Sequence, residues 1–241
     1  MQLDPRTVAR DIPGIVDETF PQLTAGTVAH LNTQIDSMEI SPVPANLLSR
    51  SKLQKAMLFE LAYTVGEHLL QGEKNLDWDK CFKETIKRQR VYFDAKLPDV
   101  LEAHDAEIAV IVGSNLAKGL NEISHMRGEK IISRPVVPGL EWVSSGVGDF
   151  SVGHTLIEVK CTIKRFSSAD YRQVAIYWLL SYAASVEGRG EEWRDFILLN
   201  PRNGEKLTMK FDDLLSMVGG GRTKIDALQL FQSLIGSRLR S

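Results

Sequence analysis

Apolar residues recur at helical spacing through much of the first half of the chain, from position 46 to about 126. The clearest stripe takes every fourth position and predicts an amphipathic helix that ends near Gly72. It consists of Leu53, Met57, Leu61, Val65 and Leu69. We expect two further helices, over residues 78–93 and roughly 101–126, with Gly113 as a candidate break in the second. Residues 1–45 hold five of the nine prolines, so we expect no long helix there.

After Gly128 the hydrophobic period falls to about 2, which indicates strands. Residues 130–137 favour an edge strand because Pro135 interrupts them, and residues 148–152 and 155–163 favour two more. A capping box of Ser167 and Asp170 opens a helix that runs to about residue 185. Strands over 196–199 and 206–209 flank the turn sequence Asn-Pro-Arg-Asn-Gly and predict a hairpin. Helices over 211–218 and 224–235 follow.

This order of elements predicts an α/β fold with its centre in residues 100–215. We divide the chain into a mostly helical N-terminal region, residues 1–98, and an α/β domain with C-terminal helices, residues 99–241. The N-terminal region is interpreted as a docking or substrate-binding element. Its helices are also the candidate surface for a protein partner or a homo-oligomer.

Composition indicates a folded globular chain, with 43% hydrophobic and 25% charged residues. The longest purely apolar run, residues 174–180, is far shorter than the ~20 residues of a membrane span, so we expect no membrane partner. The N-terminus lacks an apolar signal region, and two cysteines are too few for a disulfide scaffold. We therefore expect a cytoplasmic protein.

The segment 148–162 carries the candidate chemistry, because it alternates strictly around Gly153-His154, which suits a two-residue type II′ turn. The predicted register pairs Val152 with Thr155, Phe150 with Ile157, and Asp149 with Glu158. One face of this hairpin is apolar and is expected on the core; it consists of Phe150, Val152, Ile157, Val159, Cys161 and Ile163. The other face is polar except for Leu156; it consists of Asp149, Ser151, Glu158, Lys160 and Thr162.

Two carboxylates face each other in this register, those of Asp149 and Glu158, at about 5 Å between Cβ atoms. Like charges so placed destabilise a sheet unless positive charge lies between them. Lys160 lies on the same face and supplies part of that charge. A divalent cation, Mg²⁺ or Mn²⁺, would supply the rest, since both prefer oxygen ligands. The alternative interpretation is a solvated Asp/Glu/Lys face of an ordinary amphipathic hairpin.

The helix that follows the hairpin carries Gln173 and Tyr177 four residues apart, hence on one face. Both side chains could line a cleft beside Glu158. Taken alone, Tyr177 is more typical of a core aromatic with a tethered hydroxyl.

Together, Gly-Asp149, Glu158-Val-Lys160 and Gln173-x-x-x-Tyr177 resemble the motifs of the PD-(D/E)xK nuclease superfamily, specifically its RecB-like and phage-exonuclease-like branch. The resemblance covers about residues 113–215. It implies a core with a central mixed sheet flanked by helices. It also implies a metal-dependent nuclease, with DNA favoured over RNA, of a kind that serves phage defence, repair or mobile elements.

The resemblance assigns roles to individual residues. In the family the acidic pair binds one or two Mg²⁺ ions and the lysine positions or activates the attacking water, which implies these roles for Asp149, Glu158 and Lys160. The carbonyl of Val159 would complete the metal site, and Gln173 and Tyr177 would belong to the catalytic set. The family adds an acidic or histidine ligand from an upstream helix, for which Glu122 is the candidate, with a surface glutamate as the alternative. The four cysteines of iron–sulfur relatives are missing, so no such cluster is expected.

Charge adds local detail to this interpretation, because the chain is slightly acidic overall, with a formal net charge of −2. Positive charge is concentrated at residues 83–90, which is more often typical of a solvated helix face, and again from residue 160 to 172. Within the second stretch Lys164, Arg165 and Arg172 are candidates for phosphate contacts. The competing function is a non-catalytic subunit of this fold that binds nucleic acid or protein within a larger complex.

Overall fold

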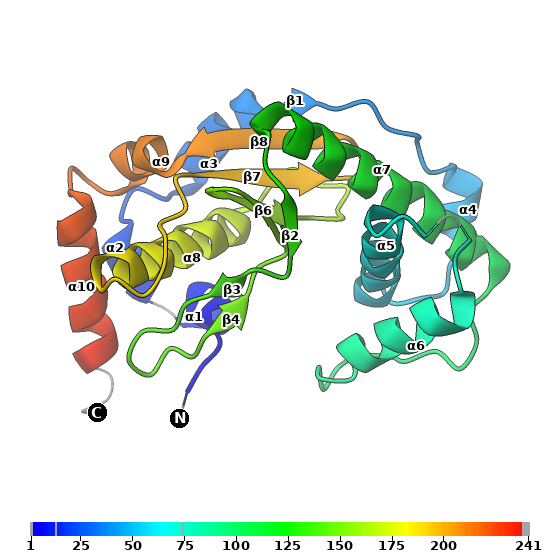
Figure 1. Cartoon of the computed structure of the whole chain (residues 1–241). Helices are drawn as coiled ribbons and strands as arrows, with labels where there is room; N and C mark the ends of the chain where they lie inside the picture. Colours follow the sequence, from blue (N-terminus) through cyan, green and yellow to red (C-terminus); the bar gives the residue numbers. More distant parts are fainter. Residues whose placement is uncertain (1, 13, 74, 238–241) are drawn as a thin grey trace.

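In the described part of the chain, an α/β fold is built around a six-stranded mixed sheet (Figure 1). The structure is a computed structural model and describes residues 2–12, 14–73 and 75–237. The strands lie in the order β1, β8, β7, β6, β5, β2, and all neighbours are antiparallel except β6 and β7. They are β1 (Asp36–Ser37), β2 (Ile131–Ser133), β5 (Phe150–Val152), β6 (Thr155–Val159), β7 (Asp195–Asn200) and β8 (Glu205–Lys210). The short strands β3 (Val136–Val137) and β4 (Gly146–Val147) pair separately.

Helices cover both faces of the sheet (Figure 1). The helix α8 (Ser168–Val186) lies on one face, because it is the crossover that returns the chain from β6 to the parallel strand β7. On the other face α7 (Ala103–Arg127) packs against β2 and β5. The remaining helices are α1 (Pro5–Asp11), α2 (Ile15–Thr19), α3 (Ala25–Leu31), α4 (Ala45–Arg50), α5 (Lys55–Leu70), α6 (Trp78–Gln89), α9 (Phe211–Val218) and α10 (Lys224–Ser237), with a 3₁₀ turn η1 (Asn32–Gln34) after α3.

Separate hydrophobic cores form on the two faces. The core under α8 also takes side chains from α1–α3, α9 and α10, and includes Trp178, Phe196 and Phe211. The core on the opposite face contains Phe150 and Ile157 of the hairpin together with residues of α7. A third cluster joins α4, α5 and α7 into a helical arm. Because α8 and α7 cover opposite faces, the central strand β6 is buried on both sides.

Two of the three predicted hairpin pairs are confirmed, and the pairing of Asp149 with Glu158, one position beyond the start of β5, stays a prediction. Val152 pairs with Thr155 and Phe150 with Ile157. Gly153 has φ +54°, whereas His154 is not among the residues of positive φ, which fits type II′ and excludes type I′. The capping box of Ser167 at the start of α8 and the hairpin of β7 and β8 are confirmed as well. So are the edge position of β2 and the helices α9 and α10.

Two helix predictions are wrong in detail. The helix α6 ends at Gln89 instead of Phe93, because Gln89 is its last buried residue and a helix without an apolar face to pack gains little stability. The helix α7 is unbroken at Gly113, which lies where α7 crosses α5. A Cβ there would lie 2.7 Å from Val65 Cγ1 and 2.9 Å from the backbone nitrogen of Gly66. Gly113 therefore permits close helix packing and does not mark a break.

The strand expected over 155–163 is also too long. The strand β6 ends at Val159. Ile163, which was expected in the core, is 73% exposed. The physical reason is that the chain leaves the sheet here to reach the start of α8. Cys161, on the same expected face, packs instead at the edge of the cluster formed by α4, α5 and α7.

The N-terminal residues form only short helices before residue 45, as predicted. They pack closely on the rest of the chain: Val8 of α1 lies in the same core as Trp178 of α8, and Asp36 of β1 pairs with Lys206 of β8. Side chains from both sides of residue 98 thus share one core. A boundary at that residue stays a prediction. In the described segments, every helix is too short or too polar to cross a membrane.

Candidate active site

The hairpin turn brings Asp149 and Glu158 to one place on adjacent chain segments. Glu158 lies in β6, and Asp149 directly precedes β5. The carboxylate Oδ2 of Asp149 accepts a hydrogen bond from the backbone nitrogen of Val159 at 2.7 Å. The carbonyl of Asp149 accepts two more, from the Tyr63 hydroxyl at 2.8 Å and from the backbone nitrogen of Arg134 at 2.9 Å. Asp149 is therefore held from β6, from the residue that follows β2 and from α5.

Glu158 is almost fully buried, with 1% of its surface exposed. Its Oε2 accepts hydrogen bonds from Gln173 Nε2 at 2.7 Å and from Lys160 Nζ at 3.3 Å. Its Oε1 is buried and accepts no hydrogen bond within the described chain. Burial, with the neighbouring charge of Asp149, raises the pKa of Glu158 to about 8, although Lys160 and Arg6 oppose the rise. The carboxylate thus sits in an environment short of positive charge.

Lys160 joins the acidic pair to α8 and α1. Besides Glu158, its ammonium donates to Gln173 Oε1 at 3.1 Å and lies 3.7 Å from Asp170. Asp170 in turn pairs with Arg10 of α1 at 3.1 Å. The lysine is consequently fixed on the same side as Glu158, as the parity of the strand predicted.

Gln173 and Tyr177 meet on one face of α8, as their spacing predicted. Gln173 Nε2 lies 3.2 Å from the Tyr177 hydroxyl, and both residues are buried. Burial and the charge of Glu158 raise the pKa of Tyr177, so its hydroxyl stays neutral. Tyr177 therefore reaches Glu158 only through Gln173, and it is at the same time a core aromatic.

The second face of the hairpin is not a solvated surface, because α8 covers it. Ser151, Leu156 and Glu158 are all buried there. Leu156, the apparent exception in the sequence, packs into the core under α8. Ser151 and Glu158 are thus enclosed between the sheet and a helix, whereas Asp149, Lys160 and Thr162 are only partly buried, so Glu158 is not an ordinary solvated charge.

The other predicted site residues lie apart from this cluster. Glu122 is exposed on α7, where Lys118 is a charged neighbour. Over residues 2–12, 14–73 and 75–237, no three His, Cys, Asp or Glu side chains gather as a metal-ligand group. The role of Glu122 as a further metal ligand stays a prediction.

The three candidate phosphate contacts flank the start of α8. Lys164 is exposed, Arg165 donates to the carbonyl of Asn32 at 3.0 Å, and Arg172 forms an ion pair with Asp17. The last two are tied to the N-terminal helices.

Sequence reasoning missed the residues that surround the pair from distant segments. Tyr63 comes from α5, and burial together with Asp149 raises its pKa, so its hydroxyl remains a donor. Burial lowers the pKa of Arg6, but Tyr92, Tyr177, Asp149 and Glu158 outweigh that effect and raise it. The signal for Arg6 and Arg10 is their four-residue spacing, which places both on one face of α1. Nothing in the sequence joins that helix to the hairpin.

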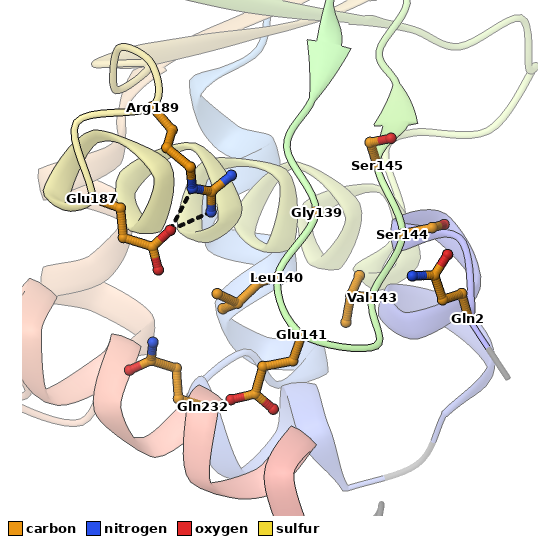
Figure 2. A pocket seen from close by; sticks show the side chains of 10 residues that line it. All are labelled: Gln2, Gly139, Leu140, Glu141, Val143, Ser144, Ser145, Glu187, Arg189 and Gln232. Carbon is orange, nitrogen blue, oxygen red and sulfur yellow. Dashed lines mark hydrogen bonds and ion pairs between the residues drawn. The ribbon is translucent and has the colours of Figure 1, made fainter.

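A separate pocket of about 580 Å³ lies away from the acidic pair. Figure 2 shows its polar lining, with Arg189 paired to Glu187 beside Gln232 of α10, and Glu141 and Ser144 from the segment between β3 and β4. None of Asp149, Glu158 and Lys160 lines it. The candidate site is therefore the hairpin cluster.

Comparison with protein-family models, curated proteins and solved structures gave no match.

Proposed function

We propose that this chain is a metal-dependent nuclease that hydrolyses phosphodiester bonds, with DNA as the favoured substrate. The observation that carries the proposal is Glu158: a buried carboxylate within electrostatic reach of Asp149, with one oxygen that accepts no hydrogen bond in the described chain. A buried charge is costly even when it is partly compensated, here by Lys160 at 3.3 Å. A divalent cation shared with Asp149 would offset that cost, because a bound ion is the largest charge in such a site.

The resemblance to the PD-(D/E)xK superfamily supports the same proposal. Its motif residues Asp149, Glu158 and Lys160 lie together, and Gln173 and Tyr177 lie beside them. The central mixed sheet flanked by helices is compatible with the core of that superfamily. The grouping of the motif residues and the sheet topology are separate observations, and both support the proposed nuclease function.

The donor set fits Mg²⁺ or Mn²⁺, which prefer oxygen ligands. Asp149, Glu158 and the carbonyl of Val159 would hold the ion, while Glu122 would require a longer reach. When bound, the ion would supply positive charge to the phosphate and make a bound water more acidic.

The protein's own groups would orient the reaction. The amide of Val159 holds the Asp149 carboxylate in place. Gln173 bonds both Glu158 and Lys160, and so keeps the ammonium beside the pair, where it would bond the attacking water or a phosphate oxygen. Tyr177 holds Gln173. Lys164, Arg165 and Arg172 would hold neighbouring phosphates, which positions a strand without reading its sequence.

The test is incubation of the protein with linear, circular and single-stranded DNA and with RNA, in Mg²⁺, Mn²⁺ or EDTA. We expect metal-dependent cleavage that Asp149→Asn abolishes, because an amide replaces a charged ligand of a hard cation. Lys160→Ala should abolish or severely reduce cleavage yet leave Mn²⁺ binding in a calorimetric titration largely unchanged. The exposed Asp213 supplies a matched control, since Asp213→Asn should cut like wild type.

A negative result would favour the non-catalytic alternative. If the wild-type chain cuts no substrate and calorimetry detects no Mn²⁺ binding, the proposal is wrong, even if nucleic acid is bound. Cleavage of circular DNA would identify an endonuclease, and cleavage of linear DNA alone an exonuclease.

A further inference from the structure

The connection between α6 and α7 exposes an unusual number of apolar side chains. Twelve large hydrophobic residues are exposed in the described chain, and five of them lie within residues 91–100, here named the α6–α7 turn. They are Val91, Tyr92, Phe93, Leu97 and Val100. Phe93 is completely exposed, at 104% of its reference surface. A concentration of exposed apolar surface is typical of a binding site, whereas single exposed residues are not.

The exposure does not come from fraying, because the turn is held by hydrogen bonds. Gln54, at the start of α5, accepts a bond from the backbone nitrogen of Lys96 at 2.8 Å and donates to the carbonyl of Asp94 at 3.4 Å. Within the turn, the backbone nitrogen of Ala95 donates to the carbonyl of Tyr92 at 3.3 Å. The turn therefore presents its aromatic rings on a fixed backbone.

Positive charge surrounds these rings. From Lys83 to the end of the turn at Val100, five basic residues stand against three acidic ones, Glu84, Asp94 and Asp99. One of the three, Glu84, is paired with Arg88 at 2.6 Å and with His68 at 3.1 Å. The exposed cations are Lys83, Lys87, Arg90 and Lys96. Exposed aromatic rings among lysines and arginines match a strand of nucleic acid, whose bases stack and whose phosphates are negative.

The turn is connected to the acidic pair through two helices. It follows α6, which packs on α5 (Figure 1). The helix α5 supplies the Tyr63 hydroxyl that donates to the carbonyl of Asp149. Tyr92 is among the groups that raise the pKa of Arg6, together with Asp149 and Glu158, against the lowering effect of burial. The guanidinium of Arg6 thus lies within electrostatic reach of Tyr92 in the turn and of the acidic pair.

We propose that the α6–α7 turn is a stacking surface for unpaired bases, which makes nucleic acid with a single-stranded segment the substrate class of this site. Tyr92 and Phe93 stack on successive bases, and Lys83, Lys87 and Arg90 hold the phosphates of the same strand. This inference rests on the proposed nuclease function and specifies its substrate. Intact duplex is disfavoured at the turn, because its base faces are already stacked on one another.

The experiment measures binding in EDTA, where cleavage is off. Fluorescence anisotropy would follow labelled oligo(dT), a blunt duplex, and anionic phosphatidylglycerol vesicles as a lipid probe. Tyr92→Ala with Phe93→Ala should weaken binding of oligo(dT) about tenfold or more, since each stacked base contributes substantially, and should change blunt-duplex binding much less. Tyr92→Phe with Phe93→Tyr keeps both rings and should bind oligo(dT) like wild type. The control Val186→Ala with Ile225→Ala removes exposed apolar side chains elsewhere.

Each outcome bears on one proposal. Equal oligo(dT) affinity of the Tyr92→Ala, Phe93→Ala protein and the control overturns the stacking surface, as does a loss confined to vesicle binding. If the wild-type protein cuts DNA while the double alanine variant binds and cuts equally well, only this inference fails. If the turn binds oligo(dT) through its rings but no metal supports cleavage, the nuclease proposal fails and the stacking surface stands.

Discussion

Replacement of Glu158 by glutamine should stabilise the metal-free protein at alkaline pH. The side chain is buried at 1% exposure, and burial beside Asp149 raises its pKa from 4.5 to about 8. Below pH 4.5 the carboxyl is protonated in both the folded and the unfolded chain. Between pH 4.5 and 8 the folded chain keeps a proton that the unfolded chain has lost, so the free energy of unfolding falls as pH rises. Glutamine can still accept from Gln173 and Lys160 and does not titrate.

The magnitude follows from linkage. One proton retained by the folded state changes the free energy of unfolding by about 1.4 kcal/mol per pH unit. Over the window from pH 4.5 to about 8, the single group is therefore worth on the order of 5 kcal/mol. Wild type and Glu158→Gln should be close in stability near pH 5 and should differ by a few kcal/mol near pH 8, with the variant the more stable.

Urea unfolding in EDTA at a series of pH values measures this difference, with the exposed Glu107→Gln as the matched control. Saturating Mg²⁺ should raise the stability of wild type at pH 8 and leave Glu158→Gln unchanged, because only a folded site with both carboxylates binds the ion. A constant difference between the two proteins from pH 5 to 9 would refute the reasoning, since it would mean that Glu158 does not titrate in this window.

Two further predictions test the packing and the phosphate contacts. Gly113→Ala should lower the free energy of unfolding by about 1–3 kcal/mol, because its Cβ would meet α5 backbone; Gly190→Ala, which meets open space, should change it little, and equal urea midpoints would contradict the packing. Neutralising Lys164, Arg165 and Arg172 together should weaken DNA binding similarly for all sequences and reduce its salt dependence, since fewer counterions are released. Loss of binding to one sequence alone, with the salt slope unchanged, would indicate base recognition instead.

Local chemistry made much of the fold predictable. The glycine at position 153 and the alternation around it define the hairpin, and the confirmed register of Phe150 with Ile157 follows from them. Ser167 marks the start of α8 through its capping box. These features depend on residues within a few positions of each other, so the sequence alone contains them.

Contacts between distant segments were not predictable in the same way. The burial of Glu158 under α8 depends on how a helix packs on a sheet. The alternation of polar and apolar residues cannot distinguish a solvated polar face from an enclosed one. Arg10 reaches Asp170 across 160 positions, with no local pattern to pair them. The exposure of Ile163 has the same origin, because the end of β6 is set by the path of the chain into α8.

The two oxygens of Glu158 differ in their surroundings, and this difference links the fold to the proposed chemistry. Both of its hydrogen bonds fall on Oε2, from Gln173 and Lys160. Oε1 instead faces Gly148, where a Cβ would come within 3.6 Å of it. A glycine directly before Asp149 thus places no side chain against the oxygen that receives no bond within the described chain. Such an arrangement costs stability in the metal-free protein, and a cation held between Oε1 and Asp149 would recover it.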